Sequence, residues 1–218
     1  EIDRFEPQEY WTIKADVETT KKKSFEAELQ KVDGKKAYIP NEAIAMELRN
    51  TLKNEQYLVS KVTKKRVRRN PHAPFTTSTL QQAAFQKLGF TTKRTMTLAQ
   101  QLYEGVTLAD GEATGLITYM RTDSFTLSKD IKTTIGDKIK DAYGDTYHQK
   151  REYKNKTKNC QEAHECIRPV HIEYSTLQHI NSLENEHKKM YDLIWKRTIA
   201  SQMSDNKKQK CKVIIQNN

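Results

Sequence analysis

Hydrophobic and polar residues alternate along the first part of the chain, which is typical of half-buried β-strands. One predicted strand carries its apolar residues at every second position: Trp11, Ile13, Ala15 and Val17. A second strand with the same period covers residues 25–29. Asp33 and Gly34 then predict a hairpin turn, because glycine accepts a positive φ, and residues 35–39 are expected to return as a short strand.

A four-residue spacing marks the first helix. Ile44, Leu48 and Leu52 recur on one helical stripe, which predicts a helix over about 42–53. Asn41 is a suitable N-cap, since its side-chain oxygen can accept a backbone N–H. A strand is expected at 57–62, and it runs into a basic stretch that ends at residue 69. These elements predict a compact, β-rich α+β unit with one helix.

Pro71 and Pro74 force an extended path and separate this unit from a mainly helical remainder. Helix, glycine-containing turn and helix form the helix-turn-helix pattern, in which a following strand could be a wing. Residues 146–160 are polar and basic, which indicates a mobile loop. The remaining elements are predicted as helices at 79–88, 93–104, 129–142, 162–168 and 184–203, a short helix or turn at 175–183, and strands at 116–120 and 212–215, the last without a partner downstream.

The net charge says more about a possible partner than the rest of the composition does. The 218-residue chain has a formal net charge of +10, which favours a polyanionic partner such as nucleic acid, although solvated lysines explain a basic surface equally well. Basic residues in two runs are candidate phosphate contacts: Lys64, Lys65, Arg66, Arg68 and Arg69 in the first, and Lys150, Arg151 and Lys154 in the second.

Several classes of protein are excluded by what the sequence lacks. No apolar run is long enough for a membrane helix, and no secretory signal opens the chain. Three cysteines without CxxC spacing provide neither a disulfide framework nor a zinc site, which fits a cytoplasmic setting. No glycine-rich phosphate loop is present. The chain starts at Glu1 rather than at a methionine, which suggests a piece of a longer polypeptide.

Residues 115–124 concentrate reactive side chains after an apolar start. A tyrosine in such a strand is usually a packed residue with a hydrogen-bonded hydroxyl. Two residues after Tyr119, however, Arg121 offers a planar fork that can hold the oxygens of a phosphodiester. Tyr119 is therefore a candidate nucleophile and Arg121 its phosphate partner. Asp123 and Ser124 could orient this arginine or cap the next turn.

His164 stands in a second polar cluster. On a short helix with Glu162, Glu165 and Arg168, it could donate a charge-assisted hydrogen bond to a phosphate. A local ion-pair network at helical spacing explains the same residues. The second histidine of an HExxH motif is absent, so a metalloprotease is rejected.

With these residues in place, the chain resembles the type IA DNA topoisomerases, specifically the bacterial topoisomerase I branch. Met120 before Arg121 favours that branch over the topoisomerase III branch. The segments that carry the resemblance, in order, are FEPQEYW at 5–11, IPNE at 39–42, RNP at 69–71, PFTTSTLQQ at 74–82, KLGF at 87–90, AQQLYEG at 99–105, GLITYMRTDS at 115–124, AHE at 163–165, IRP at 167–169 and LIWKR at 193–197.

The resemblance implies a role for each candidate. The family tyrosine that matches Tyr119 attacks a single-strand phosphodiester and forms a 5′-phosphotyrosine link, while the residues matching Arg121 and His164 act on the scissile phosphate. Glu104 matches a glutamate near the active site, and Asp123 and Arg168 are expected to support it. Single-stranded or negatively supercoiled DNA is the expected partner, with the protein a monomer in the bacterial nucleoid.

The resemblance also implies a domain plan. Residues 1–12 would enter the fold, 13–78 would form the first part of a β-rich arch domain, 79–205 a winged-helix-like helical domain that carries the tyrosine, and 206–218 the start of a strand that returns to the arch. The family's acidic Mg²⁺-binding domain has no counterpart in these residues. We therefore expect no metal site in this chain and no DNA relaxation by the chain alone.

Two other hypotheses remain open from the residues. A non-catalytic winged-helix DNA-binding module would leave Tyr119 structural. A protein-interaction domain would leave the basic surface incidental.

Overall fold

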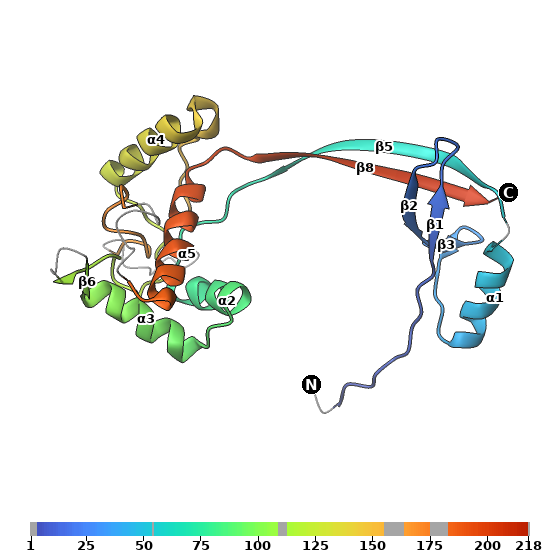
Figure 1. The fold of residues 1–218 in the computed structure, drawn as a ribbon, viewed down its shortest axis with the longest axis horizontal. Helices are drawn as coiled ribbons and strands as arrows, with labels where there is room; N and C mark the ends of the chain where they lie inside the picture. Colours follow the sequence, from blue (N-terminus) through green and yellow to red (C-terminus); the bar gives the residue numbers. More distant parts are fainter. Residues whose placement is uncertain (1–3, 54, 109–112, 155–163, 175–182, 218) are drawn as a thin grey trace. The chain divides into compact units, whose positions relative to one another are not determined.

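The computed structural model describes residues 4–53, 55–108, 113–154, 164–174 and 183–217. The chain divides into two compact units: residues 1–65 together with 209–218, and residues 66–208. The predicted α+β class is confirmed, with small antiparallel sheets beside helices that lie mostly in the second unit (Figure 1).

The first unit is built from short β-hairpins and one helix. Strand β1 (Lys14–Glu18) pairs antiparallel with β2 (Ser24–Glu28), placing Ala15 opposite Ala27. Strands β3 (Lys31–Val32) and β4 (Lys35–Lys36) form the predicted hairpin around Asp33 and Gly34, both at positive φ. The predicted strand over 35–39 is therefore shorter than expected.

The helix of this unit, α1 (Glu42–Leu52), begins where the sequence predicts it. The side chain of its N-cap Asn41 accepts a hydrogen bond from the backbone N–H of Ile44. Of the described apolar residues in this unit, only Ile39 and Ala45 are buried. The first unit thus encloses a very small core.

Strand β5 (Tyr57–Arg69) is twice as long as the predicted strand, because it continues through the basic stretch. It pairs with β8 (Asn206–Asn217) in a two-stranded sheet, as the two long arrows in Figure 1 show. The sequence predicted a strand at 212–215 without a partner downstream. The structure shows that its partner lies about 150 residues upstream, where Ser60 donates a hydrogen bond to the carbonyl of Ile214.

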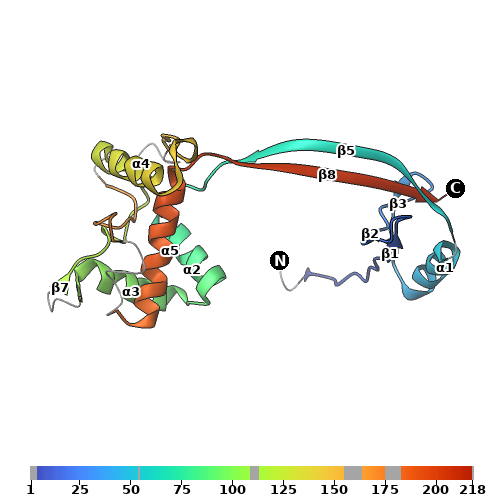
Figure 2. The ribbon, with the colours of Figure 1, turned by 45° about the horizontal axis from the view of Figure 1, so that its top comes forward.

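The second unit packs three helices around one apolar cluster. Helix α2 (Thr77–Leu88) and helix α3 (Thr92–Glu104) both contact α5 (Asn185–Ser201), and Figure 2 shows the three together. Helix α2 begins two residues earlier than predicted, because the capping box joins Thr76 with Thr79 rather than Thr79 with Gln82. The cluster centres on Leu80, Leu98, Leu102, Tyr191 and Ile194.

A second cluster lies under helix α4 (Lys129–Tyr143), which a 3₁₀ turn, η2 (Asp145–Tyr147), follows. Ile135 and Ile139 of α4 pack against Ile199 of α5 and against Cys166. Residues 148–154 were predicted as part of a mobile loop, but Arg151 and Tyr153 are hydrogen-bonded to the end of α5 and the residues after it. Residues 155–160 lie outside the described residues.

Three further predictions need correction or fall outside the structure. The strand at 116–120 is wrong: Ile117 makes a single bridge to Pro169, and the small hairpin that follows α3 is β6 (Val106–Thr107) with β7 (Ala113–Thr114). The helix at 162–168 is wrong over 164–168, which is extended and bridges Phe75 through Ile167. Residues 175–182 are outside the described residues.

The two described cysteines differ in a way that predicts thiol chemistry. Burial raises the pKa of Cys166 to about 12, whereas Cys211 is exposed on β8. The thiolate is the reactive form. In a Cys160→Ser protein we therefore expect one fast reaction with a disulfide reagent, lost on Cys211→Ser, and release of the Cys166 thiol only on unfolding. Two fast thiols in the folded protein would contradict this assignment.

Candidate active site

Residues 115–118 lie in an extended segment that is fixed from two sides. On one side the backbone N–H of Leu116 donates to the carbonyl of Leu102 at the end of α3, with a nitrogen–oxygen distance of 2.7 Å. On the other side Thr118 is paired with residues 166–168. Its N–H donates to the carbonyl of Arg168 (2.9 Å) and its hydroxyl to the carbonyl of Cys166 (2.7 Å). The residue before Tyr119 is therefore held by backbone partners distant in sequence.

Residues 120–122 are fixed in a similar way by the start of α2. The Thr77 hydroxyl donates to the carbonyl of Met120 (2.7 Å) and accepts from the N–H of Thr122 (2.9 Å). The N–H of Thr77 in turn donates to the carbonyl of Thr122 (2.9 Å). Tyr119 therefore lies between two anchors, Thr118 and the Thr77 contacts, that leave its backbone little freedom.

Exposure alternates along this segment. Met120, Thr122 and Ser124 are buried, whereas Tyr119, Arg121 and Asp123 are exposed. The buried hydroxyl of Ser124 accepts the N–H of Thr126, so this serine stabilises a local turn. Of the polar residues singled out from this stretch, Tyr119, Arg121 and Asp123 thus share the solvent side, whereas Ser124 does not.

Tyr119 is not the packed tyrosine that an apolar strand usually contains. Its side chain is 46% exposed, and no described residue hydrogen-bonds its hydroxyl. Its ring meets Tyr103 of α3 edge to face, with ring centroids 5.3 Å apart and an interplanar angle of 65°. This contact orients the ring, while nearly half of the residue's surface stays exposed.

Gly115 permits the close approach of the segment to α3. A Cβ at this position would lie 2.7 Å from the backbone oxygen of Tyr103, closer than real Cβ contacts come. Sequence reasoning missed Tyr103, Thr77 and Thr118 as parts of the site. No local motif identifies them, because each acts through a contact with a residue far away in the chain.

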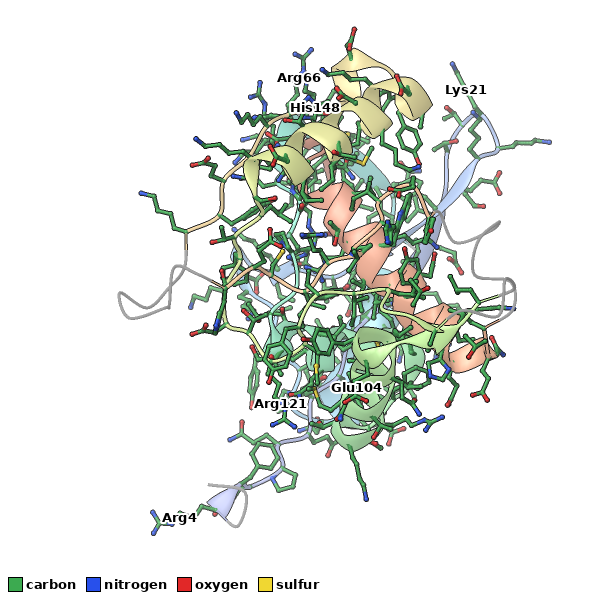
Figure 3. The ribbon with its side chains drawn as sticks, turned by 90° about the vertical axis from the view of Figure 1, so that its left-hand side faces the viewer. Arg4, Lys21, Arg66, Glu104, Arg121 and His148 are labelled. Atoms are coloured by element: carbon green, nitrogen blue, oxygen red, sulfur yellow. The ribbon has the colours of Figure 1, made fainter. Side chains whose placement is uncertain are left out.

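Glu104 occupies the last turn of α3, next to Tyr103. Its carboxylate is exposed and accepts a hydrogen bond from the Gln100 side chain at 2.7 Å. Figure 3 labels Glu104 and Arg121 in the same part of the unit. The placement of Glu104 beside the tyrosine that contacts Tyr119 is compatible with a supporting role.

Arg168 is engaged with partners inside the protein. Its guanidinium binds Glu165 through Nη2 (2.5 Å) and Nε (3.1 Å), and Nη1 donates to the carbonyl of Pro169. The second carboxylate oxygen of Glu165 accepts the N–H of Ser128, the N-cap of α4. The local ion pair that the sequence offered as an alternative to a phosphate contact is thus present, on an extended segment instead of a helix. Through Ser128 it joins α4 to the segment beside Tyr119.

His164 begins the same extended segment and is exposed. Antiparallel pairing of Ile117 with Pro169 brings residues 166–170 alongside residues 116–118, and His164 lies two residues before this pairing. Within the described residues, no hydrogen bond or ion pair joins His164 to Tyr119 or Arg121. The structure therefore places His164 on the segment that pairs beside Tyr119, without a described hydrogen bond or ion pair between the two side chains.

The basic candidates divide into exposed and engaged residues. Those on β5 (Lys64, Lys65, Arg66, Arg68 and Arg69) are exposed, and so are Lys150 and Lys154. Arg151 is different: its guanidinium forms an ion pair with Asp205 and donates to the carbonyl of Met203. Arg151 has less capacity for a DNA phosphate than its place in the basic run suggests.

No group of three or more metal-ligating side chains occurs among the described residues. The side chains that the structure describes therefore do not fit a Mg²⁺ site. None of the described helices has the length and hydrophobicity needed to span a membrane.

The family model described as DNA topoisomerase matches residues 1–218, the whole chain. The chain belongs to this family. It is 47% identical over 210 residues to "DNA topoisomerase 1" of Rickettsia felis, covering 94% of this chain and 27% of that protein. It is 44% identical over 211 residues to "DNA topoisomerase 1" of Xylella fastidiosa, covering 93% and 26%.

A solved structure, full-length topoisomerase I from Thermotoga maritima, aligns with a TM-score of 0.78 at 31% identity. The alignment covers 99% of this chain and 33% of that one. The predicted membership of the bacterial topoisomerase I branch of the type IA enzymes is confirmed. The chain spans about a quarter of the length of the curated relatives that it matches.

Replacing Gly115 tests whether the close approach to α3 positions Tyr119. Gly115→Ala forces the segment away from the Tyr103 carbonyl, so we expect strand cleavage by the complete enzyme to fall at least tenfold, with a loss of roughly 1–3 kcal/mol in unfolding free energy. A matched control is Gly34→Ala, which is strained by its φ of +76° but has open space. Equal cleavage by the two variants would contradict the role of Gly115.

Proposed function

We propose that this chain supplies the nucleophilic tyrosine and phosphate-binding groups of an ATP-independent topoisomerase that cleaves and rejoins one DNA strand. The observation that carries the proposal is the exposed Tyr119 on a segment anchored at both sides, with Arg121 two residues away on the solvent side. Membership of the DNA topoisomerase family supports it.

In the proposed reaction the Tyr119 oxygen attacks a backbone phosphorus. A bond forms between this oxygen and phosphorus while the bond from phosphorus to the 3′-oxygen breaks. The phenol gives up its proton, and the leaving 3′-oxygen takes one up. The products are a 5′-phosphotyrosine link and a free 3′-hydroxyl. Because one ester replaces another, the reverse attack rejoins the strand without ATP.

Arg121 has the chemistry to stabilise the charge that develops on the phosphate. A guanidinium binds two phosphate oxygens at once, and its contribution increases as negative charge accumulates in the transition state. We assign His164 a second phosphate contact, made when DNA is bound. Glu104 and Asp123 are proposed as supporting groups. Arg168, held by Glu165, is a positioning residue that keeps segment 164–170 beside Thr118.

The proposal extends to the cofactor and partners of the complete protein. The family implies Mg²⁺, whose ligands we assign to polypeptide outside this chain. Single-stranded and negatively supercoiled DNA would be the substrate, with the exposed lysines and arginines of β5 tracking its backbone. We further propose that the protein acts as a monomer in the bacterial cytoplasm and that the isolated chain does not relax DNA.

A non-catalytic DNA-binding module is the second candidate function. The α2–α3 pair followed by the β6–β7 hairpin favours it, because this is the order of elements in a winged helix. Such a module would not need an exposed tyrosine hydroxyl, whereas strand cleavage does.

Substitution of the tyrosine separates the two functions. Tyr119→Phe removes only the attacking oxygen, so the complete enzyme should lose all covalent DNA complex while it retains affinity for single-stranded DNA within about twofold. Denaturing gels of labelled oligonucleotide measure the complex. Tyr103→Phe is the matched control, because it keeps the ring contact and should cleave normally. Unchanged cleavage by Tyr119→Phe would favour the binding module.

Substitution of the arginine tests the phosphate role. Arg121→Ala should lower the single-turnover cleavage rate about 10²–10³-fold, comparable with the loss of one oxyanion-hole donor. Arg121→Lys should recover part of the rate, because it keeps the charge but loses the fork. A rate for Arg121→Ala within threefold of wild type would argue against the assignment.

A further inference from the structure

A hollow of about 180 Å³ lies between α4 and the chain that follows it, on elements other than the Tyr119 segment. Gly136 lies in the wall of this hollow. A Cβ there would lie 2.8 Å from Nε2 of His148, so the histidine ring occupies the space that a side chain would fill. Figure 3 shows His148 beside the α4 ribbon. Glycine destabilises a helix interior relative to alanine, and here it makes room for the ring.

The hollow is lined with an excess of positive charge. Lys132, Lys140 and Lys150 line it, against one carboxylate, Asp137. Lys140 is 3.8 Å from Asp137, and Lys132 is 3.3 Å from Glu152, which is 78% exposed. The pair of Lys140 with Asp137 is exposed and therefore weak, so a phosphate can compete for Lys140, whereas the Lys132 side chain is only 14% exposed. Lys150 has no ion pair in the part of the chain that the structure describes.

An exposed aromatic pair adjoins the hollow. Tyr143 ends α4 and Tyr147 ends η2, with ring centroids 6.4 Å apart, and the two side chains are 53% and 52% exposed. Their own contact leaves both rings accessible to a further planar group. Exposed tyrosines beside a basic groove are the combination that binds unpaired bases, because every base has a π-face for stacking.

Helical spacing aligns these features. Lys132, Gly136, Lys140 and Tyr143 recur at intervals of four, four and three residues, which places them on one face of α4. At 1.5 Å per residue, this face is about 16 Å long from Lys132 to Tyr143. That length suits a few nucleotides, with phosphates at the lysines and a base at the tyrosines.

We propose that the α4 hollow and the Tyr143–Tyr147 pair form a second binding site for single-stranded DNA, separate from the Tyr119 segment. The phosphates contact Lys140 and Lys150, and an unpaired base stacks on Tyr143 or Tyr147. The choice of DNA as the polyanion rests on the proposed function. Such a site would hold a DNA strand on the helical unit while the Tyr119 segment binds another part of the DNA.

Salt dependence of binding tests the phosphate contacts. In the complete protein with Tyr119→Phe, so that DNA is not cut, fluorescence anisotropy of a labelled oligothymidine gives affinity at several salt concentrations. Each lysine replaced in Lys140→Gln/Lys150→Gln should lower the salt slope by about 0.7, the value for one single-strand phosphate contact. Lys138→Gln is the matched control, because it removes the same charge from the opposite face of α4.

Stacking has a separate signature. Tyr143→Leu/Tyr147→Leu should weaken oligothymidine binding about tenfold without a change of salt slope, and should leave affinity for a blunt duplex unchanged. A second measurement uses the protein with unaltered α4, so that no folding defect of a variant can affect it. Bound oligothymidine should slow the hydrogen exchange of the backbone amides of residues 140–150.

Three results would overturn the proposal: no protection of residues 140–150, a lysine pair that behaves like Lys138→Gln, or tyrosine variants that bind oligothymidine normally. The covalent DNA–protein complex is measured in a separate experiment, with the protein in which Tyr119 is intact. Trapping without an effect at α4 rejects this site alone, and binding at α4 in a protein that never traps DNA rejects the proposed function alone.

Discussion

The hydrogen bonds of two threonines hold the candidate site together. Thr118 pairs with the backbone of Cys166 and Arg168, and Thr77 pairs with the backbone of Met120 and Thr122. Tyr119 lies between these anchors, so its backbone is fixed without a regular strand or helix. Buried backbone groups need partners, and here the partners come from the start of α2 and from segment 164–170. The tyrosine ring can therefore face solvent without loss of order in its main chain.

The same constraint connects the site to the rest of the helical unit. Arg168 binds Glu165, which in turn caps α4 through Ser128, while Ile167 pairs with Phe75 just before α2. Phe75 is fully buried, with the guanidinium of Arg197 of α5 4.3 Å from its ring centroid. A displacement of α4 or α5 would thus move the residues that anchor Tyr119. These contacts give the α4 face, with its basic hollow and exposed tyrosines, a physical connection to the candidate site.

Sequence patterns predicted the elements whose hydrogen bonds are local. The helices at 42–52, 77–88, 92–104 and 129–143 have caps and periodic apolar faces, and the Asp33–Gly34 hairpin has its turn chemistry. The strand at 116–120 and the helix at 162–168 were wrong for a common reason. The segments pair with each other about 50 residues apart through Thr118 and Arg168, and with further distant residues such as Leu102 and Phe75, and no local periodicity reveals these pairings. The partner of β8 was missed for the same reason. Tyr119 and Arg121 could be proposed from the sequence because a phenol and a guanidinium two residues apart form a chemical pattern, and their roles stay a prediction.

The most direct measurement of the central claim is the chemical identity of the DNA–protein link. The complete enzyme is mixed with a single-stranded oligonucleotide, denatured during turnover and digested with trypsin and nuclease, and the peptides are sequenced by mass spectrometry. A phosphate-linked nucleotide remnant is expected on the tryptic peptide 95–121, which contains both Tyr103 and Tyr119, with fragment ions that place it on the Tyr119 oxygen. A remnant on another residue, such as Tyr103, or efficient strand rejoining without any covalent link, would contradict the claim.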